Sequence, residues 1–385
     1  MANNNENKIL NVPHLRFPEF SGEWDSERLE NLTVSIGDGL HSTPVYCEQG
    51  DYCFINGNNI IDGKVSINEK TLRVTKEEAY KYNAALLKVD TILMSINGTI
   101  GNVALYNGEN IMLGKSACYI NPSSRIVREY LFHILSSPRI QAYFQGEVTG
   151  TTIKNLSLRT IRGSKILLPS NEEQKKIARL FSLVDERIAT QNKIIEDLKK
   201  LKSAIYQNLF FHLQGDKVPL SELAEIIKGQ QINGSELSEN GKYYVMNGGI
   251  TPSGYYDNYN TEADTISISE GGNSCGYVQY NSSDFWSGGH CYTLRIKPTA
   301  LISTPFLFHF LKWKEPDIMA LRSGSGLPNI QKKDLSKVCI IVPTLDEQQQ
   351  LIALLSTFQM KIENEEIFTS NLNKQKQHLL SQMFI

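Results

Sequence analysis

Two long stretches of the chain share one pattern of apolar and polar positions. They cover residues 169–210 and 343–384, at a constant offset of 174 residues. In both, apolar residues recur every three or four positions, and after the opening proline neither glycine nor proline interrupts the pattern. This spacing predicts two amphipathic helices of about 40 residues, each roughly 60 Å long.

Each stretch also carries the residues that start a helix. Ser170 with Glu173, and Thr344 with Glu347, form the Ser/Thr-x-x-Glu pattern of a capping box just after a proline. The two predicted helices therefore begin at equivalent positions of the repeat.

The apolar stripe of both helices follows a heptad repeat with charged flanks, which is typical of coiled-coil packing. Because each helix has one stripe and the chain holds two helices, the simplest prediction buries one stripe against the other. A coiled coil between two chains is the alternative. Polar residues near the middle of the stripes would fix the register. The predicted a and d positions are Ile177, Val184, Gln191, Leu198 and Ile205 with Leu180, Arg187, Ile194, Leu201 and Asn208, then Leu351, Phe358, Glu365, Leu372 and Leu379 with Leu354, Lys361, Phe368, Gln375 and Gln382.

The residues ahead of each helix alternate short β-type runs with turns rich in glycine and asparagine, in an order that repeats. This predicts an α+β fold: two β-rich mixed domains separated by two long coiled-coil helices, with a pseudo-two-fold internal repeat. Strands are expected at 91–96, 102–106, 117–120 and 165–168, then at 265–269, 276–280 and 291–296, with short helices at 128–135 and 307–311. The predicted parts are a tail over 1–20, a domain over 21–168, a helix over 169–213, a domain over 214–342 and a helix over 343–385.

Composition narrows the classes of function. The chain has 385 residues, enough for two or three domains, and 39 basic against 41 acidic residues. This balance gives no overall basic field, so a site for a polyanion must be a local patch. The six cysteines form no C-x-x-C pair, the N-terminus lacks an apolar signal core, and no apolar run is long enough for a bilayer. We expect a cytoplasmic protein with reduced thiols and no membrane contact.

No motif of the sequence predicts catalysis. Residues 108–116 resemble a phosphate-binding loop, but Glu109 stands where the motif G-x-x-x-x-G-K-[ST] needs its first glycine, and a strand rather than a helix is expected after Ser116. Asn121-Pro122 lacks the aromatic residue of an adenine methyltransferase motif. The glycines of 271–276 lie between two predicted strands and do not open a helix, so they do not form a dinucleotide-binding motif. The histidines and cysteines have no zinc spacing. We therefore predict no catalytic residue and no metal site.

The remaining signal is for binding. Loops at equivalent places in both domains carry amide, hydroxyl and imidazole groups able to read base edges, with cations able to neutralise phosphates. For any one of these residues, an ordinary solvated loop is the simpler interpretation. The candidate DNA-binding residues are His41, Thr43, Asn97, Thr99, Lys115, Thr149, Thr151 and Lys154 in the first domain, and Asn247, Asn273, His290, Arg322, Ser323, Ser325, Asn329 and Lys332 in the second.

Three features together resemble the specificity subunit of type I restriction–modification systems. They are the helix openings at 168–174 and 342–348, the order domain–helix–domain–helix, and the run Pro-His-Leu-Arg-Phe-Pro-Glu-Phe-Ser-Gly-Glu-Trp at 13–24. The resemblance implies two target-recognition domains held apart by antiparallel helices. Each domain would read one half of an asymmetric, bipartite site in double-stranded DNA, and helix length would set the spacer.

The same resemblance implies the partners. Two methyltransferase subunits would bind the helices and flip an adenine for methylation, and motor–endonuclease subunits would complete the restriction complex. S-adenosylmethionine, ATP and Mg²⁺ would belong to those partners, with no cofactor in this chain. Two alternatives stay open: a coiled-coil adaptor whose domains bind proteins or glycans, and a self-contained methyltransferase that would itself bind S-adenosylmethionine.

Overall fold

The computed structural model describes residues 11–150, 154–324, 326 and 328–384, and these fall into two compact units. The first unit holds residues 11–192 and 367–384, and the second holds residues 193–366, in each case within the described ranges. Each unit thus combines one β-rich domain with part of both long helices. The mixed helix and strand content is the α+β class that the sequence predicts.

The first unit is built on a four-stranded antiparallel sheet of order β2-β10-β7-β8. A smaller sheet places β3 between β6, which is antiparallel to it, and β9, which is parallel. Strand β1 pairs separately with β11, which leads into the first long helix. The bounds are β1 Asp25–Arg28, β2 Thr33–Asp38, β3 Tyr52–Ile55, β4 Ile60–Ile61, β5 Lys64–Val65, β6 Arg73–Val74, β7 Ile92–Ser95, β8 Val103–Leu105, β9 Ile111–Leu113, β10 Ala117–Pro122, β11 Lys165–Leu168, and α1 Lys76–Tyr82, α2 Arg128–Leu135, α3 Pro138–Gly146 and α4 Leu158–Gly163.

The second unit repeats this topology with different strand lengths. Its four-stranded antiparallel sheet has the order β13-β19-β16-β17, its small sheet places β14 between antiparallel β15 and parallel β18, and β12 pairs with β20. The strands at 165–168, 265–269 and 291–296 and the helix at 128–135 lie where the sequence predicts them. The bounds are β12 Asp216–Pro219, β13 Ala224–Lys228, β14 Tyr243–Met246, β15 Tyr255–Tyr256, β16 Thr265–Ser269, β17 Val278–Asn281, β18 Trp286–Ser287, β19 Cys291–Ile296, β20 Cys339–Val342, and α6 Leu220–Leu223, α7 Thr304–Trp313, α8 Glu315–Ala320 and α9 Lys332–Leu335.

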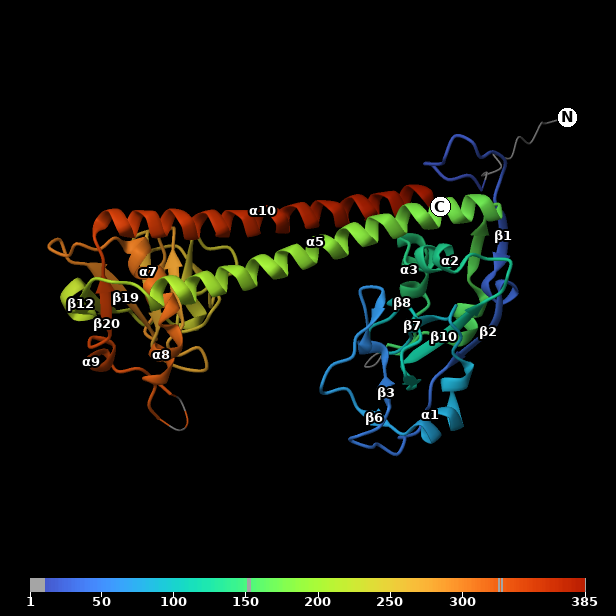
Figure 1. The fold of residues 1–385 in the computed structure, drawn as a ribbon, viewed down its shortest axis with the longest axis horizontal. Helices are drawn as coiled ribbons and strands as arrows, with labels where there is room; N and C mark the ends of the chain where they lie inside the picture. The colour runs from blue at the N-terminus through green and yellow to red at the C-terminus, as the bar shows by residue number, and fades with distance from the viewer. Residues whose placement is uncertain (1–10, 151–153, 325, 327, 385) are drawn as a thin grey trace. The chain divides into compact units, whose positions relative to one another are not determined.

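Two long helices, α5 (Asn171–Phe211) and α10 (Leu345–Met383), contribute to the core of both units. In the first unit, α2 and α3 lie between the sheet and the first part of α5 (Figure 1). There the ring of Phe384, just after α10, packs against Phe181 of α5 and Tyr130 of α2. In the second unit, Phe210 near the end of α5 packs against Phe306 and Phe310 of α7. Each β-rich domain therefore buries the start of one long helix and the end of the other.

Within each unit the two helices run antiparallel, because residues later in α5 contact residues earlier in α10. In the first unit Phe181 stacks on Phe384, and Asp185 pairs with Lys376 at 2.5 Å. In the second unit Lys199 pairs with Glu366 at 2.6 Å, and Lys202 donates to Gln359 at 2.5 Å. The antiparallel direction predicted from the family resemblance is the one observed.

The packed face of the helices differs from the predicted heptad register. The predicted a positions are buried or half-buried, but the predicted d positions Ile194, Leu201 and Leu354 are 39%, 49% and 41% exposed. The residues one step later carry the seam instead, as Ile195 at 9% and Leu355 at 1% exposure show. Adjacent apolar pairs, Ile194-Ile195 and Leu354-Leu355, are compatible with two registers, and the fold buries the later residue of each pair.

Both long helices begin with a Ser or Thr N-cap, but the glutamate three residues later has a different partner in each helix. In α10, the Thr344 and Glu347 side chains each accept a hydrogen bond from the other's backbone N–H, at 3.4 and 3.0 Å, which completes the predicted capping box. In α5, the Glu173 N–H donates to Ser170 Oγ at 3.3 Å, but the Glu173 carboxylate binds the Arg16 guanidinium instead.

Arg16 belongs to a segment that the sequence sets apart as a tail. Residues 11–20 in fact pack on the first unit: the Leu15 N–H donates to the Gln382 carbonyl at 3.0 Å, and the Trp24 N–H donates to the Asn11 carbonyl at 2.8 Å. Phe17 packs against the core, where Lys176 lies 4.6 Å from its ring centroid. Among the described residues, no helix combines the length and apolar character required to cross a bilayer.

Candidate nucleic-acid interface

The antiparallel order of the main sheet gathers predicted site residues of the first unit at one edge. The ends of β2 and β7 and the starts of β10 and β8 all lie at this edge. Around it lie residues 97–99, 114–116, 149–150 and 154–155, which we call the first edge site. Asn97 Nδ2 donates to the Lys115 carbonyl at 3.0 Å, so the turns after β7 and before β10 are joined.

A short β-bridge ties the pre-helix loop to this edge. The Gly98 N–H donates to the Lys154 carbonyl at 3.1 Å, and the Leu156 N–H donates to the Ile96 carbonyl at 2.8 Å. Thr149 and Asn155 exchange backbone hydrogen bonds of 3.0 and 2.9 Å across the loop. Asn97, Lys115, Thr149 and Lys154 are therefore brought together, while Thr151 lies outside the described residues.

The other candidates of the first domain lie on neighbouring loops. The Leu40 N–H donates to the Leu113 carbonyl at 2.8 Å, which places His41 on a loop beside the turn that holds Lys115. The imidazole of His41 is exposed, and its Nε2 lies 2.6 Å from Asp38 Oδ2. Thr43 and Thr99 are exposed as well. These three residues are available to a ligand without being held in the bridge.

The second unit repeats the same backbone bonds at the offset of 174 residues. The Gly272 N–H donates to the Pro328 carbonyl at 3.1 Å, and the Ile330 N–H donates to the Glu270 carbonyl at 2.9 Å. Ser323 and Asn329 exchange bonds of 2.9 and 3.0 Å. Gly98 and Gly272 both have positive φ, 76° and 79°, which glycine adopts without strain. One backbone scaffold is therefore present twice.

The side chains on this scaffold differ between the units. Around the second edge site (residues 247, 271–273, 288–290, 322–324 and 328–329), Asn247 Oδ1 accepts from the His290 N–H at 3.0 Å. Asn273 and His290 are exposed beside the bridge. Arg322 and Lys332 are also exposed, on either side of the loop, and Ser325 lies outside the described residues. The two edges thus offer different donors and acceptors from the same backbone frame.

A buried carboxylate under the second edge site was not predicted. Glu270 is 8% exposed, and its Oε1 accepts from Lys228 Nζ at 2.7 Å and from the Tyr292 hydroxyl at 2.9 Å. Burial, with this hydrogen bond, raises the pKa of Tyr292 to about 12. Ile96 holds the equivalent position in the first unit, so the network belongs to the second unit. Applying the 174-residue offset to single positions would have revealed this exchange of Ile for Glu.

The exposed groups of both edge sites suit recognition rather than reaction. Amide, hydroxyl and imidazole groups can pair with base edges, and Lys and Arg can neutralise phosphates. Lys115 and Ser116 lead into strand β10, as predicted, so residues 108–116 do not form a phosphate-binding loop before a helix. Within the described ranges, no group of three His, Cys, Asp or Glu side chains could hold a metal ion.

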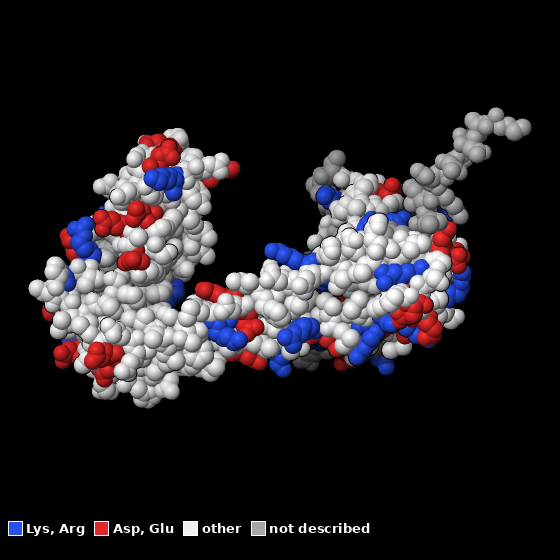
Figure 2. Space-filling model, turned by 90° about the horizontal axis from the view of Figure 1, so that it is seen from above, with Lys and Arg blue, Asp and Glu red and all other residues white. Residues whose placement is uncertain are grey.

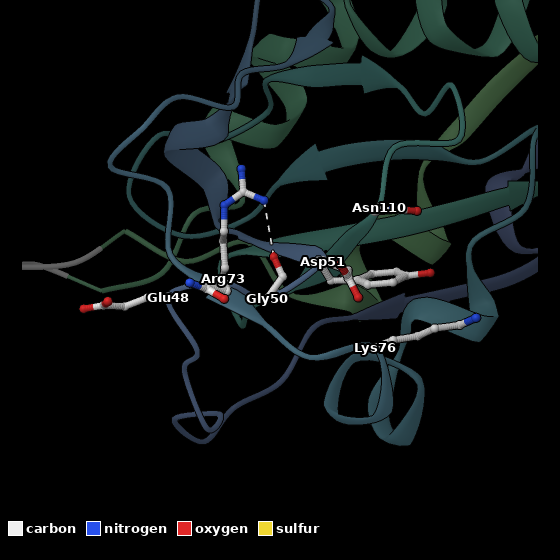
Figure 3. Close-up of a pocket in the computed structure, with 8 residues that line it drawn as sticks. Glu48, Gly50, Asp51, Arg73, Lys76 and Asn110 are labelled. Atoms are coloured by element: carbon white, nitrogen blue, oxygen red, sulfur yellow. Dashed lines mark hydrogen bonds between the residues drawn. The ribbon is translucent and has the colours of Figure 1, made fainter.

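A separate hollow of about 560 Å³ lies in the first unit at the start of β3. Its lining mixes both charges, with Glu48 and Lys76 extending in opposite directions (Figure 3). Arg73 Nη1 is committed to the Gly50 carbonyl at 3.3 Å, drawn as the dashed line. None of the predicted site residues lines this hollow, and its side chains form no acid–base or nucleophile grouping.

Charge on the long helices is interspersed rather than segregated. Figure 2 shows lysines and arginines beside acidic residues along the helical stretch. The pairs Lys199–Glu366 and Lys200–Glu196, both at 2.6 Å, are examples on exposed side chains. Such surface pairs contribute little stability and create no single-sign field. A polyanion would therefore have to be met by local cations, such as the predicted site residues Lys115, Lys154, Arg322 and Lys332.

Known proteins match this chain over most of its length. Residues 22–200 and 215–372 match the family described as "Type I restriction modification DNA specificity domain". A protein of Mycoplasma pneumoniae named as a type I specificity subunit is 36% identical over 149 residues, which cover 38% of this chain and 40% of that protein. One of Methanocaldococcus jannaschii, named as the MjaX specificity subunit, is 24% identical over 422 residues, covering 97% and 96%.

A solved structure shares the fold. The crystal structure of the S subunit of a type I restriction–modification system from M. genitalium has a TM-score of 0.60 at 22% identity, and the alignment covers 97% of this chain and 99% of that one. The family match includes both domains and most of both long helices. By that match, this chain belongs to the family of type I restriction–modification DNA specificity proteins.

Proposed function

We propose that the chain is the non-catalytic DNA-recognition subunit of a type I restriction–modification complex. Each edge site reads one half of a bipartite, asymmetric sequence in double-stranded DNA. The family match supports DNA specificity as the role, and the names of the relatives are those of specificity subunits. The two half-sites are a further step, and one structural observation carries it.

That observation is the repeated backbone frame with different side chains. The bonds from Gly98 to Lys154 and from Gly272 to Pro328 are the same bond in two copies, yet Ile96 and Glu270 differ beneath them. Because the backbone frame is repeated, the loops of both units would lie in the same way against a groove of DNA. The donors and acceptors that differ between the units would then select different bases. Two readers of one design but unlike specificity would together define an asymmetric site.

The second part of the proposal concerns the long helices. An antiparallel helix pair keeps its ends at a distance fixed by helix length, about 1.5 Å per residue. Such a pair would set the number of unread base pairs between the half-sites and would offer surfaces to two methyltransferase subunits. Motor–endonuclease subunits would join the same complex. S-adenosylmethionine, ATP and Mg²⁺ would be held by these partners.

The test is a map of methylated adenine in a host that expresses the full chain with its methyltransferase subunit. A single bipartite motif, absent without the chain, is the expected result. A chimera that replaces residues 214–342 by the equivalent domain of a relative should change one half of the motif only. A change in both halves, or in neither, would contradict independent readers. A chain that assembles with partners but ignores DNA would instead be an adaptor.

A further inference from the structure

A groove of about 890 Å³ lies in the second unit beside the first turn of α10. Its lining carries four carboxylates, from Asp216, Glu222, Asp346 and Glu347, and includes neither lysine nor arginine. Two leucines of the same lining face solvent, since Leu301 is 71% and Leu345 is 47% exposed. The groove is therefore acidic with apolar walls, and it lies apart from the residues of the second edge site.

The equivalent position in the first unit is filled by the chain itself. The pairing of Asp25 with Leu168 matches that of Asp216 with Val342, which aligns the two positions residue by residue. There Arg16 binds Glu173 through two parallel bonds, Nε to Oε1 at 2.7 Å and Nη2 to Oε2 at 2.8 Å. This is the strong bidentate geometry of an arginine–carboxylate pair. Glu173 is 1% exposed as a result, whereas its counterpart Glu347 is exposed.

Two further side chains close the position in the first unit. Trp24 is 3% exposed and stands where the second unit has Gly215, which has no side chain to place there. The Val127 and Ser303 N–H groups donate to the equivalent residues Gln174 and Gln348, so Arg125 is the counterpart of Leu301. Arg125 pairs with Glu27 at 3.0 Å. The groove of the second unit is thus the space that an arginine segment, an indole and an ion pair occupy in the first.

The carboxylate of Glu347 can form an ion pair with an incoming cation. Hydrogen bonds from the Thr344 hydroxyl and backbone N–H, both to Oε2, hold the pKa of Glu347 below its usual value. The carboxylate is therefore ionised at neutral pH, and Oε1 is not used by these bonds. An arginine entering the groove could add to the cap without breaking it.

We propose that this groove binds an extended segment of a partner protein that carries an arginine next to an aromatic residue. The arginine would pair with Glu347 as Arg16 pairs with Glu173. The aromatic ring would cover the exposed faces of Leu301 and Leu345. The proposal concerns a surface outside both edge sites, so it stands or falls separately from the reading of DNA.

The probe is a fluorescent peptide with the sequence of residues 11–24, which already carries the Arg-Phe pair and the indole. Its binding to the full-length chain is measured by fluorescence anisotropy. Saturable binding is expected, weakened about tenfold or more by Glu347→Gln and by Leu301→Arg, which puts a cation into the acidic groove. Leu301 is exposed, so its replacement should leave the fold intact. The matched control is Glu363→Gln, an exposed acid of α10 outside the groove.

Three outcomes would overturn the proposal. One is a peptide that does not bind, and another is binding that neither Leu301→Arg nor the Arg16→Ala peptide weakens. The third is a concentration-dependent dimer of the chain that Leu301→Arg abolishes in sedimentation velocity, which would make a second copy the occupant. If the peptide instead displaced residues 11–24 of the first unit, its affinity would be unchanged by Leu301→Arg. This distinguishes displacement in the first unit from binding in the groove.

Discussion

Gln174 at the start of α5 and Gln348 at the start of α10 make the same pair of hydrogen bonds in their respective units. The Gln174 amide accepts from the Val127 N–H at 2.9 Å and donates to the Pro169 carbonyl at 3.0 Å. The Gln348 amide accepts from the Ser303 N–H at 2.9 Å and donates to the Pro343 carbonyl at 3.0 Å. Each long helix is thus locked to the short helix of its domain by a buried amide.

Removing this amide should destabilise one unit at a time. Gln174→Leu leaves the Val127 N–H and the Pro169 carbonyl without a partner in a buried setting, at an expected cost of about 1–3 kcal/mol. Hydrogen exchange should rise in the first unit for Gln174→Leu and in the second for Gln348→Leu. Gln375→Leu, on the exposed face of α10, is the control. Equal exchange in all three variants would mean that the amides are not structural locks.

A second prediction follows from two buried histidines. Burial lowers the pKa of His133 to about 3 and that of His309 to about 4, against an ordinary value of 6.5. The unfolded chain therefore binds protons between pH 6.5 and those values while the folded chain does not. Stability is fully retained above about pH 6.5 and falls as the pH drops, by up to about 1.4 kcal/mol per pH unit for each histidine.

The measurement is urea unfolding of the wild type and of His133→Leu from pH 7.5 downward. The variant replaces a neutral ring in contact with Phe181 by an apolar side chain that takes up no proton. Its stability should change less steeply between pH 6.5 and 4 than that of the wild type. Parallel curves for the two proteins would show that His133 does not contribute to the acid sensitivity.

Cations and amides of the edge sites should have separable effects on DNA binding. Arg322→Ala or Lys154→Ala removes an exposed cation beside a bridge loop, so affinity should fall for every sequence and the slope of log K against log salt should shrink by about 0.9. Asn247→Ala should instead relax preference in one half-site. The control is Lys217→Ala, an exposed lysine on β12. A changed base preference for Arg322→Ala would refute its role as a phosphate contact.

The proposed ruler can be lengthened without disturbing the seam. Seven residues, one heptad, inserted at paired positions of α5 and α10 should extend both helices by about 10 Å, roughly three base-pair steps. The methylated motif should then keep both halves and gain about three unread positions. Four residues inserted in α5 alone should rotate its seam and abolish assembly. An unchanged spacer in the first variant would exclude the helices as the ruler.

The repeated features could be predicted from sequence, and the features specific to one half could not. A constant offset predicts that Asn155 and Asn329, or Gln174 and Gln348, hold the same place, because duplicated backbone needs duplicated contacts. The choice between Ile194 and Ile195 depends on which face of the helix the fold buries, and periodicity alone does not contain that information. Arg16 could not be assigned to Glu173, since its partner lies 157 positions away. Glu270 differs: the offset of 174 residues aligns it with Ile96, but only the fold shows that its carboxylate is buried and bonded to Lys228 and Tyr292.

The interlaced use of the helices has a consequence for synthesis of the protein. Leu380 and Phe384 are buried in one core with Tyr130 and Phe181, which are translated about 250 and about 200 residues earlier. The apolar face of the first unit therefore stays uncovered until the whole second unit has been translated. A chain released early would display that face to chaperones and proteases. The first hydrophobic core can therefore close only after translation has reached Phe384.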